Sequence, residues 1–232
     1  MPTPAYRRYA IYYTAPPGPL ARFGAEWLGW DIAQGRSPAQ RPDIPGLAKP
    51  IDTLITAPRR YGFHATIKPP FRLAPSQTEA ALTAALSAFC GARAPACASG
   101  LELARLGRFL ALVATGDTAS INALAADVVR DFDHFRAAST AAEIARYNSP
   151  TLSAAQTENL QVWGYPHVMG SFRWHMTLTD KLPRAKAAAA HAALAPMLTP
   201  LLPRSFTLDA LSLVGEDCSG QFHLIHRTPL TG

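Results

Sequence analysis

Two short segments of the sequence repeat one pattern of residue types that is suited to acid–base chemistry. They are residues 63–67 (FHATI) and residues 174–178 (WHMTL), and they lie nearly half of the 232-residue chain apart. Both read aromatic-His-x-Thr-aliphatic. Because alternate side chains of a strand point to the same face, each segment is predicted to present an imidazole and a hydroxyl on one face and apolar side chains on the other.

The repeated residue types suit the hydrolysis of a phosphodiester. One neutral imidazole can take a proton from an attacking water, and a second, protonated imidazole can give a proton to the leaving oxygen. We therefore predict His64 and His175 as the catalytic pair and the hydroxyls of Thr66 and Thr177 as donors to phosphate oxygens. The competing interpretation is two ordinary half-buried strands, but the duplication of the pattern favours a site.

Four further residues are candidates for substrate binding. Strand alternation places Lys68 on the face of His64 and Arg173 on the face of His175, although a solvated position at the edge of the sheet is an equal alternative for both cations. Tyr61 precedes the first motif, and Tyr165 lies in a Gly-Tyr-Pro turn where it could line a cleft or simply pack.

Other catalytic and cofactor motifs are absent from the sequence. There is no His-x-His or HExxH, and neither histidine motif contains an acidic residue, so we predict no metal site. GxxxxGK, GxGxxG and GxSxG also do not occur, which disfavours a phosphate-binding loop and a serine hydrolase. We expect no cofactor.

The composition is typical of a globular protein, with 48% hydrophobic and 16% charged residues. The net charge of +6 permits an anionic partner, and we predict a small phosphorylated substrate. RNA is the less favoured partner because the chain has no dense run of Lys and Arg. Three cysteines without metal-ligand spacing and the lack of a signal-type or membrane segment predict a cytoplasmic protein. We infer no membrane contact and no obligate protein partner.

The elements that position these residues are predicted from periodicity and turn residues. Ser76 with Glu79 predicts a capped helix over 76–92, Asp117 or Thr118 begins another, and Ser153 with Gln156 caps a third. A further helix over 183–202 is interrupted by Pro196 and Pro200. Strands are expected at 9–14, 61–68, 100–106, 109–115, 171–179, 206–214 and 221–227. This mixed order indicates an α+β fold with antiparallel sheets in one domain over residues 1–232.

The motifs resemble those of the 2H phosphoesterase superfamily, and most closely its branch associated with phosphonate-metabolism operons. The resemblance covers essentially the whole chain and rests on residues 8–13 (RYAIYY), 27–31 (WLGWD), 61–71 (YGFHATIKPPF), 163–166 (WGYP) and 172–179 (FRWHMTLT). It implies a two-lobed α+β fold with a pseudo-twofold axis, in which antiparallel sheets line a central cleft and helices lie outside. It also implies metal-independent hydrolysis of a small cyclic phosphate by His64 and His175, with Thr66 and Thr177 binding the phosphate.

Three functions remain in competition. The favoured one is a metal-independent phosphodiesterase acting on a ribose or nucleotide cyclic phosphate. The others are RNA 2′,3′-cyclic-end processing or a ligase-like activity on the same residues, and a non-catalytic nucleotide- or RNA-binding module. The intact double motif disfavours the third, and the lack of a dense basic stripe disfavours the second.

Overall fold

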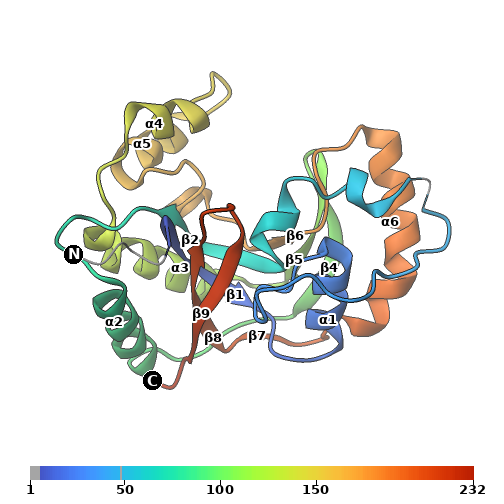
Figure 1. The fold of residues 1–232 in the computed structure, drawn as a ribbon, viewed down its shortest axis with the longest axis horizontal. Helices are drawn as coiled ribbons and strands as arrows, with labels where there is room; N and C mark the ends of the chain where they lie inside the picture. The colour runs from blue at the N-terminus through green and yellow to red at the C-terminus, as the bar shows by residue number, and fades with distance from the viewer. Residues whose placement is uncertain (1–5, 48) are drawn as a thin grey trace.

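A computed structural model describes residues 6–47 and 49–232 of the chain. The fold is α+β and is built on a seven-stranded antiparallel sheet, as predicted (Figure 1). In spatial order the strands are β4 (Gly100–Leu106), β5 (Phe109–Thr115), β6 (His175–Thr177), β2 (His64–Phe71), β1 (Arg8–Thr14), β8 (Ala210–Glu216) and β9 (Phe222–Pro229). A separate two-stranded sheet joins β3 (Ala96–Ala98) to β7 (Phe206–Leu208).

The two histidine motifs lie on neighbouring strands at the centre of the large sheet. β2 carries the first motif and β6 the second, and their register is given by one pair, Ala65 with Met176. On its other side β2 pairs with β1, whereas β6 pairs with β5. The two halves of the molecule therefore meet in one continuous sheet, and each half contributes one motif strand.

Strand alternation gives the sheet two faces with separate apolar clusters. On β1, Tyr9, Ile11 and Tyr13 join the large core, which also contains buried residues of the surrounding helices. Ala10 and Tyr12 face the other way and pack with a small cluster that includes Trp30, Ile32, Val214 and Phe222. The sheet is thus covered by helices on one face and only partly covered on the other.

Helices pack around the sheet on both sides of the central strand pair. They are α1 (Pro19–Leu28), α2 (Glu79–Gly91), α3 (Ala119–Asp131), α4 (Ala141–Tyr147), α5 (Ala154–Trp163) and α6 (Arg184–Leu198). Figure 1 shows α6 beside β4 and β5, and α2 and α3 beside the half that contains β1, β8 and β9. Short 3₁₀ turns complete the chain at Ile51–Thr53, Pro58–Tyr61, Asp133–Phe135, Met169–Ser171 and Thr199–Leu201.

Helix capping follows the sequence in one place and departs from it in another. The Ser153–Gln156 capping box begins α5, as predicted, and Gly164 ends that helix in the left-handed conformation. The predicted box at Ser76 is wrong, since α2 begins after Thr78, whose hydroxyl accepts the Ala81 amide. Helix α6 also continues through Pro196 instead of being interrupted there.

Candidate functional site

Both histidines use the same backbone contact. Nδ1 of His64 lies 3.0 Å from the carbonyl oxygen of Gly62, and Nδ1 of His175 lies 2.8 Å from that of Arg173. A carbonyl oxygen only accepts, so Nδ1 donates in each ring. This fixes the tautomer, and Nε2 of each neutral ring is left with a lone pair that can take a proton.

The register of the central strands brings the four motif side chains together. Because Ala65 pairs with Met176 in an antiparallel ladder, His64 lies across from Thr177 and Thr66 lies across from His175. All four side chains are partly exposed, whereas Ala65 and Met176 between them are fully buried. The two motifs therefore present their imidazoles and hydroxyls on one face, as predicted from the alternation.

His64 is packed against aromatic rings. The Tyr12 ring stacks on the imidazole at 3.9 Å between centroids, and Tyr61 lies at 5.9 Å. Burial lowers the pKa of His64 to about 4; the hydrogen bond to Gly62 opposes that shift, and the charge of His175 adds to it. His64 is therefore neutral near pH 7. The hydroxyl of Thr66 donates to its Nε2 over 3.1 Å.

His175 has more polar surroundings. Phe109 is 5.6 Å from its ring, and the exposed Arg173 precedes it by two residues. Burial again lowers its pKa, the hydrogen bond to the Arg173 carbonyl opposes this, and the charges of Arg173 and His167 lower it further. Among the described residues, Nε2 of His175 has no hydrogen-bond partner, so this nitrogen is open to a ligand.

The predicted position of Lys68 on the face of His64 is wrong. Relative to β1, strand β2 contains an extra residue between Thr66 and Lys68, and this β-bulge ends the simple alternation. Lys68 is 1% exposed, and its amino group donates to the Val129 carbonyl and to Asp133. The cation thereby stabilises the carboxyl end of α3, where carbonyls lack helical partners. Burial lowers its pKa to about 8, against the opposing effect of Asp133.

The remaining predicted residues surround the histidines to different degrees. Tyr61 is half-buried and packs on Phe222 at 5.1 Å as well as near His64. Tyr165 lies at 5.0 Å from the ring of Tyr147, and burial raises its pKa to about 12. Arg173 is exposed, and its charge acts on His175. These positions are compatible with substrate contact, which stays a prediction for each residue.

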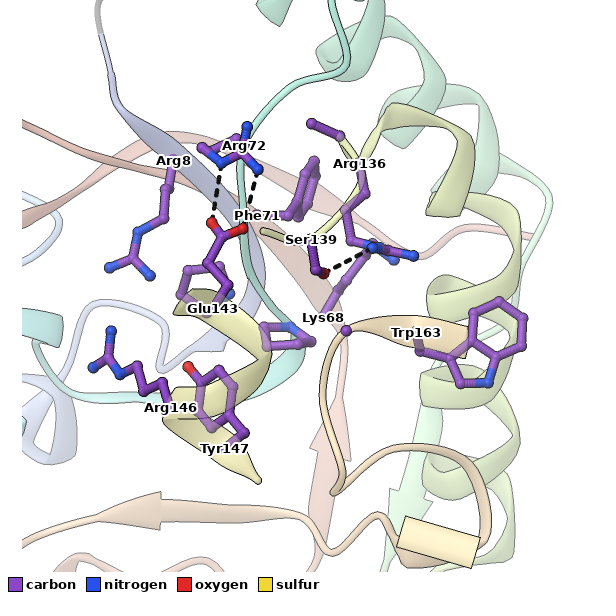
Figure 2. A pocket seen from close by; sticks show the side chains of 14 residues that line it. Arg8, Lys68, Phe71, Arg72, Arg136, Ser139, Glu143, Arg146, Tyr147 and Trp163 are labelled. Carbon is purple, nitrogen blue, oxygen red and sulfur yellow. Dashed lines mark hydrogen bonds and ion pairs between the residues drawn. The ribbon is translucent and has the colours of Figure 1, made fainter. Parts of the chain in front are cut away.

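Sequence reasoning missed a cation-lined pocket near the N-terminal end of β1 (Figure 2). It includes Arg146 and Tyr147 of α4, a helix that was not predicted. The signal was present, since Thr140 and Glu143 form a capping box at the start of α4. Sequence reasoning also did not identify Tyr12, which is fully buried and stacks on His64.

The described part of the chain contains neither a cluster of metal ligands nor a helix that could cross a membrane. In residues 6–47 and 49–232, no three His, Cys, Asp or Glu side chains gather as a metal site. Within the same residues, no helix has the length and apolar character needed to cross a membrane. Metal independence and a cytoplasmic location both stay predictions.

Two curated relatives align with the chain. Ribose 1,5-bisphosphate phosphokinase PhnN of Janthinobacterium sp. (strain Marseille) is 38% identical over 237 residues, covering 97% of this chain and 51% of that protein. The protein of the same name from Laribacter hongkongensis (strain HLHK9) is 34% identical over 180 residues, covering 75% of this chain and 40% of that protein. The chain thus spans about half the length, or less, of these relatives.

Solved structures with a similar chain path have low sequence identity. TT0787 of Thermus thermophilus has a TM-score of 0.46 and 14% identity, covering 97% of this chain and 98% of that chain. E. coli LigT, solved with 3′-AMP, has a TM-score of 0.43 and 15% identity, covering 98% and 99%.

A family model extends from the first motif to the last strand of the large sheet. It matches residues 66–223, which include Thr66, His175 and Thr177. Its description is "Protein of unknown function (DUF1045)". The match covers more than half of the chain, and the chain therefore belongs to the DUF1045 family.

Proposed function

We propose that the chain is a metal-independent phosphodiesterase that hydrolyses a small cyclic phosphate ester of a ribose or nucleotide. One observation carries this proposal. Two imidazoles on neighbouring strands each bind a backbone carbonyl through Nδ1, and they share a sheet face with two hydroxyls. Two imidazoles whose Nε2 atoms can exchange a proton with a substrate are the groups that acid–base hydrolysis requires.

The surroundings of the two rings divide the roles. His64, with its pKa of about 4, is neutral and takes the proton of the attacking water through Nε2. The water oxygen forms a bond to phosphorus as one ester P–O bond breaks. The pKa of His175 is also lowered in the free protein, and the bound phosphate anion favours its protonated form. His175 then gives its Nε2 proton to the leaving oxygen, and the product is a phosphomonoester. With substrate bound, the Thr66 hydroxyl turns from His64 Nε2 to a non-bridging oxygen, which frees that nitrogen for the water proton. Thr177 also donates to a non-bridging oxygen, where negative charge increases in the transition state.

The names of the aligned relatives bear on the substrate and not on the reaction. They are called ribose 1,5-bisphosphate phosphokinases, which fits a phosphorylated ribose as the substrate class. The kinase reaction is not part of the proposal, because the chain spans about half of those proteins and contains no GxxxxGK sequence.

The test is a substrate panel at two salt concentrations. It contains ribose cyclic phosphates, nucleoside 2′,3′-cyclic phosphates and cyclic-ended oligoribonucleotides, assayed with and without a chelator. We expect turnover of the small cyclic phosphates, unchanged by the chelator and only weakly dependent on salt. Activity lost with chelator and restored by Zn²⁺ or Mn²⁺ would contradict the mechanism. A strong preference for oligonucleotides that collapses with salt would indicate RNA-end processing instead.

A further inference from the structure

A pocket rich in cations lies at the far end of the strand pair that carries His64. We call it the cation pocket, and it has a volume of about 50 Å³. A water molecule needs roughly 10–15 Å³ on this scale, so a group of phosphate size can enter. The lining of the pocket includes the cations Arg8, Lys68, Arg72, Arg136 and Arg146, and also Tyr147.

Positive charge exceeds negative charge around this pocket. Four of its five cations are paired with three carboxylates: Glu216 binds Arg8, Asp133 binds Lys68 and Arg136, and Glu143 binds Arg72. Two positive charges are left uncompensated. One belongs to Arg146, which is exposed and has no ion pair among the described residues. An anion in the pocket would therefore be stabilised.

Several donors of the pocket are not used within the protein. Arg8 donates to Glu216 through Nε and Nη2, which leaves Nη1. In the described part of the chain, neither the guanidinium of Arg146 nor the hydroxyl of Tyr147 makes a hydrogen bond. Figure 2 shows the ends of Arg8 and Arg146 on the same side of the pocket as the Tyr147 hydroxyl. Arg136, in contrast, is occupied by Asp133, Ser139 and the Val162 carbonyl.

The cation pocket and the histidines lie along the same strands. Arg8 is four residues before Tyr12 on β1, and Tyr12 stacks on His64. At about 3.3 Å per residue, four residues correspond to roughly 13 Å of strand. His64 itself pairs with Thr14, two residues further along β1. The charge of Arg8 nevertheless acts on Tyr12, where it opposes the rise in pKa that burial causes. Tyr147, at the pocket, packs on Tyr165, so an aromatic pair borders the path between the two sites.

We propose that the cation pocket binds a second phosphate group of the substrate through Arg8, Arg146 and the Tyr147 hydroxyl. The substrate class is then a sugar or nucleotide cyclic phosphate that carries another phosphate one sugar away from the scissile one. This inference rests on the proposed phosphodiesterase function and narrows its substrate. A guanidinium is suited to the role because it can bind phosphate through two parallel hydrogen bonds.

The first experiment compares a nucleoside 2′,3′-cyclic phosphate with and without a 5′-phosphate. We expect the wild-type kcat/KM to be about tenfold or more higher with the 5′-phosphate, chiefly through KM, the factor expected for one hydrogen bond between charged groups. Arg146→Gln should abolish most of this preference, and Tyr147→Phe should reduce it. Arg105→Gln is the matched control and should keep the preference. It also removes an exposed arginine, but from β4, the edge strand that is separated from β2 and β1 by β5 and β6.

A second measurement separates failure of the pocket from failure of the enzyme. Ribose 5-phosphate, which has no cyclic ester, is titrated calorimetrically into wild type, Arg146→Gln and Arg105→Gln. Binding that only Arg146→Gln loses supports the pocket, even if no cyclic phosphate is turned over and the proposed function fails. Turnover without any preference for the 5′-phosphate overturns the pocket and leaves the function intact. A preference for oligoribonucleotides over both small substrates also overturns it, because the second phosphate then belongs to an RNA chain.

Discussion

His64 and His175 bind the same kind of backbone carbonyl, yet they lie in different surroundings. His64 is stacked under Tyr12 and accepts a hydrogen bond from Thr66, whereas His175 adjoins the exposed Arg173 and has an open Nε2 among the described residues. The shared contact fixes which nitrogen faces the ligand. The surroundings decide how easily that nitrogen is protonated. A duplicated motif can therefore supply two chemical roles without any change in its own residues.

The largest expected effect comes from removing either imidazole. His64→Ala and His175→Ala should each lower kcat on the cyclic phosphate by ~10²–10⁴-fold, the usual contribution of a general acid or base. Both side chains are partly exposed, so the variants should keep the far-ultraviolet circular dichroism spectrum of the wild type. Near-full activity in either variant would show that the two motifs do not act as a pair.

The lowered pKa of His64 should appear in the pH dependence of stability. The folded pKa of His64, about 4, is below the ordinary value of 6.5, so between these values the unfolded chain binds a proton that the folded chain does not. The free energy of unfolding should thus be unaffected by His64 above pH 7 and fall by about 3 kcal/mol as pH drops from 6.5 to 4.

Urea unfolding of the wild type, His64→Gln and His175→Gln between pH 4 and 7 measures this pH dependence of the free energy of unfolding. His64→Gln should remove most of the slope in that window. Carboxylates with low pKa values, such as Glu143 at about 2, lose their stabilising effect mainly at lower pH. His175 shifts in the same direction, so His175→Gln should also flatten the slope. A slope that neither variant changes would mean that the rings are solvated in the folded state.

The hydroxyls should matter less than the imidazoles. Thr66→Val and Thr177→Val should each cost about 1–3 kcal/mol in the free energy derived from kcat/KM, the scale of a hydrogen bond to a charged group. Thr66→Val also removes the donor to His64 Nε2, so it should shift the pH profile of kcat/KM, whereas Thr177→Val should not. Identical pH profiles for the two variants would show that the hydrogen bond from Thr66 does not affect the protonation of His64.

The smallest effect is expected from removing the hydroxyl of Tyr12, the ring that stacks on His64. The Tyr12 hydroxyl is buried, and no hydrogen-bond partner for it occurs in residues 6–47 and 49–232. Tyr12→Phe should therefore change the free energy of unfolding by less than about 1 kcal/mol and leave the stack on His64 in place. A large loss of stability or of activity would reveal a role for this hydroxyl, for example as a donor to the ligand.

Much of the fold was predictable because local patterns agreed with the tertiary structure. The strands at 100–106 and 109–115 were predicted with their observed bounds, and the Ser153 capping box marked the start of α5. The start of α2 was missed because two hydroxyl residues, Ser76 and Thr78, compete for the cap. The local pattern does not choose between them, and in the structure the Thr78 hydroxyl caps the helix.

Which side chains share a face with the two histidines was predictable only where the strands are regular. Alternation placed His64 and Thr66 correctly and failed at Lys68, because the β-bulge in β2 is a property of its pairing with β1. In the second motif, alternation would place Thr179 on the face of His175, but β6 ends at Thr177, and Thr179 is buried and accepts the Leu110 amide. Both motifs thus lose their alternation four residues after the histidine.

The cation pocket lies at the half of the molecule that contains β1 and β2, whereas the histidine motifs are contributed by both halves. A cyclic phosphate between two similar motifs could otherwise bind in either of two opposite orientations. An anion held near Arg8 and Arg146 selects one of them, and the oxygen nearest His175 is then always the same. The consequence concerns regiochemistry: ring opening would yield one phosphomonoester isomer instead of a mixture of two.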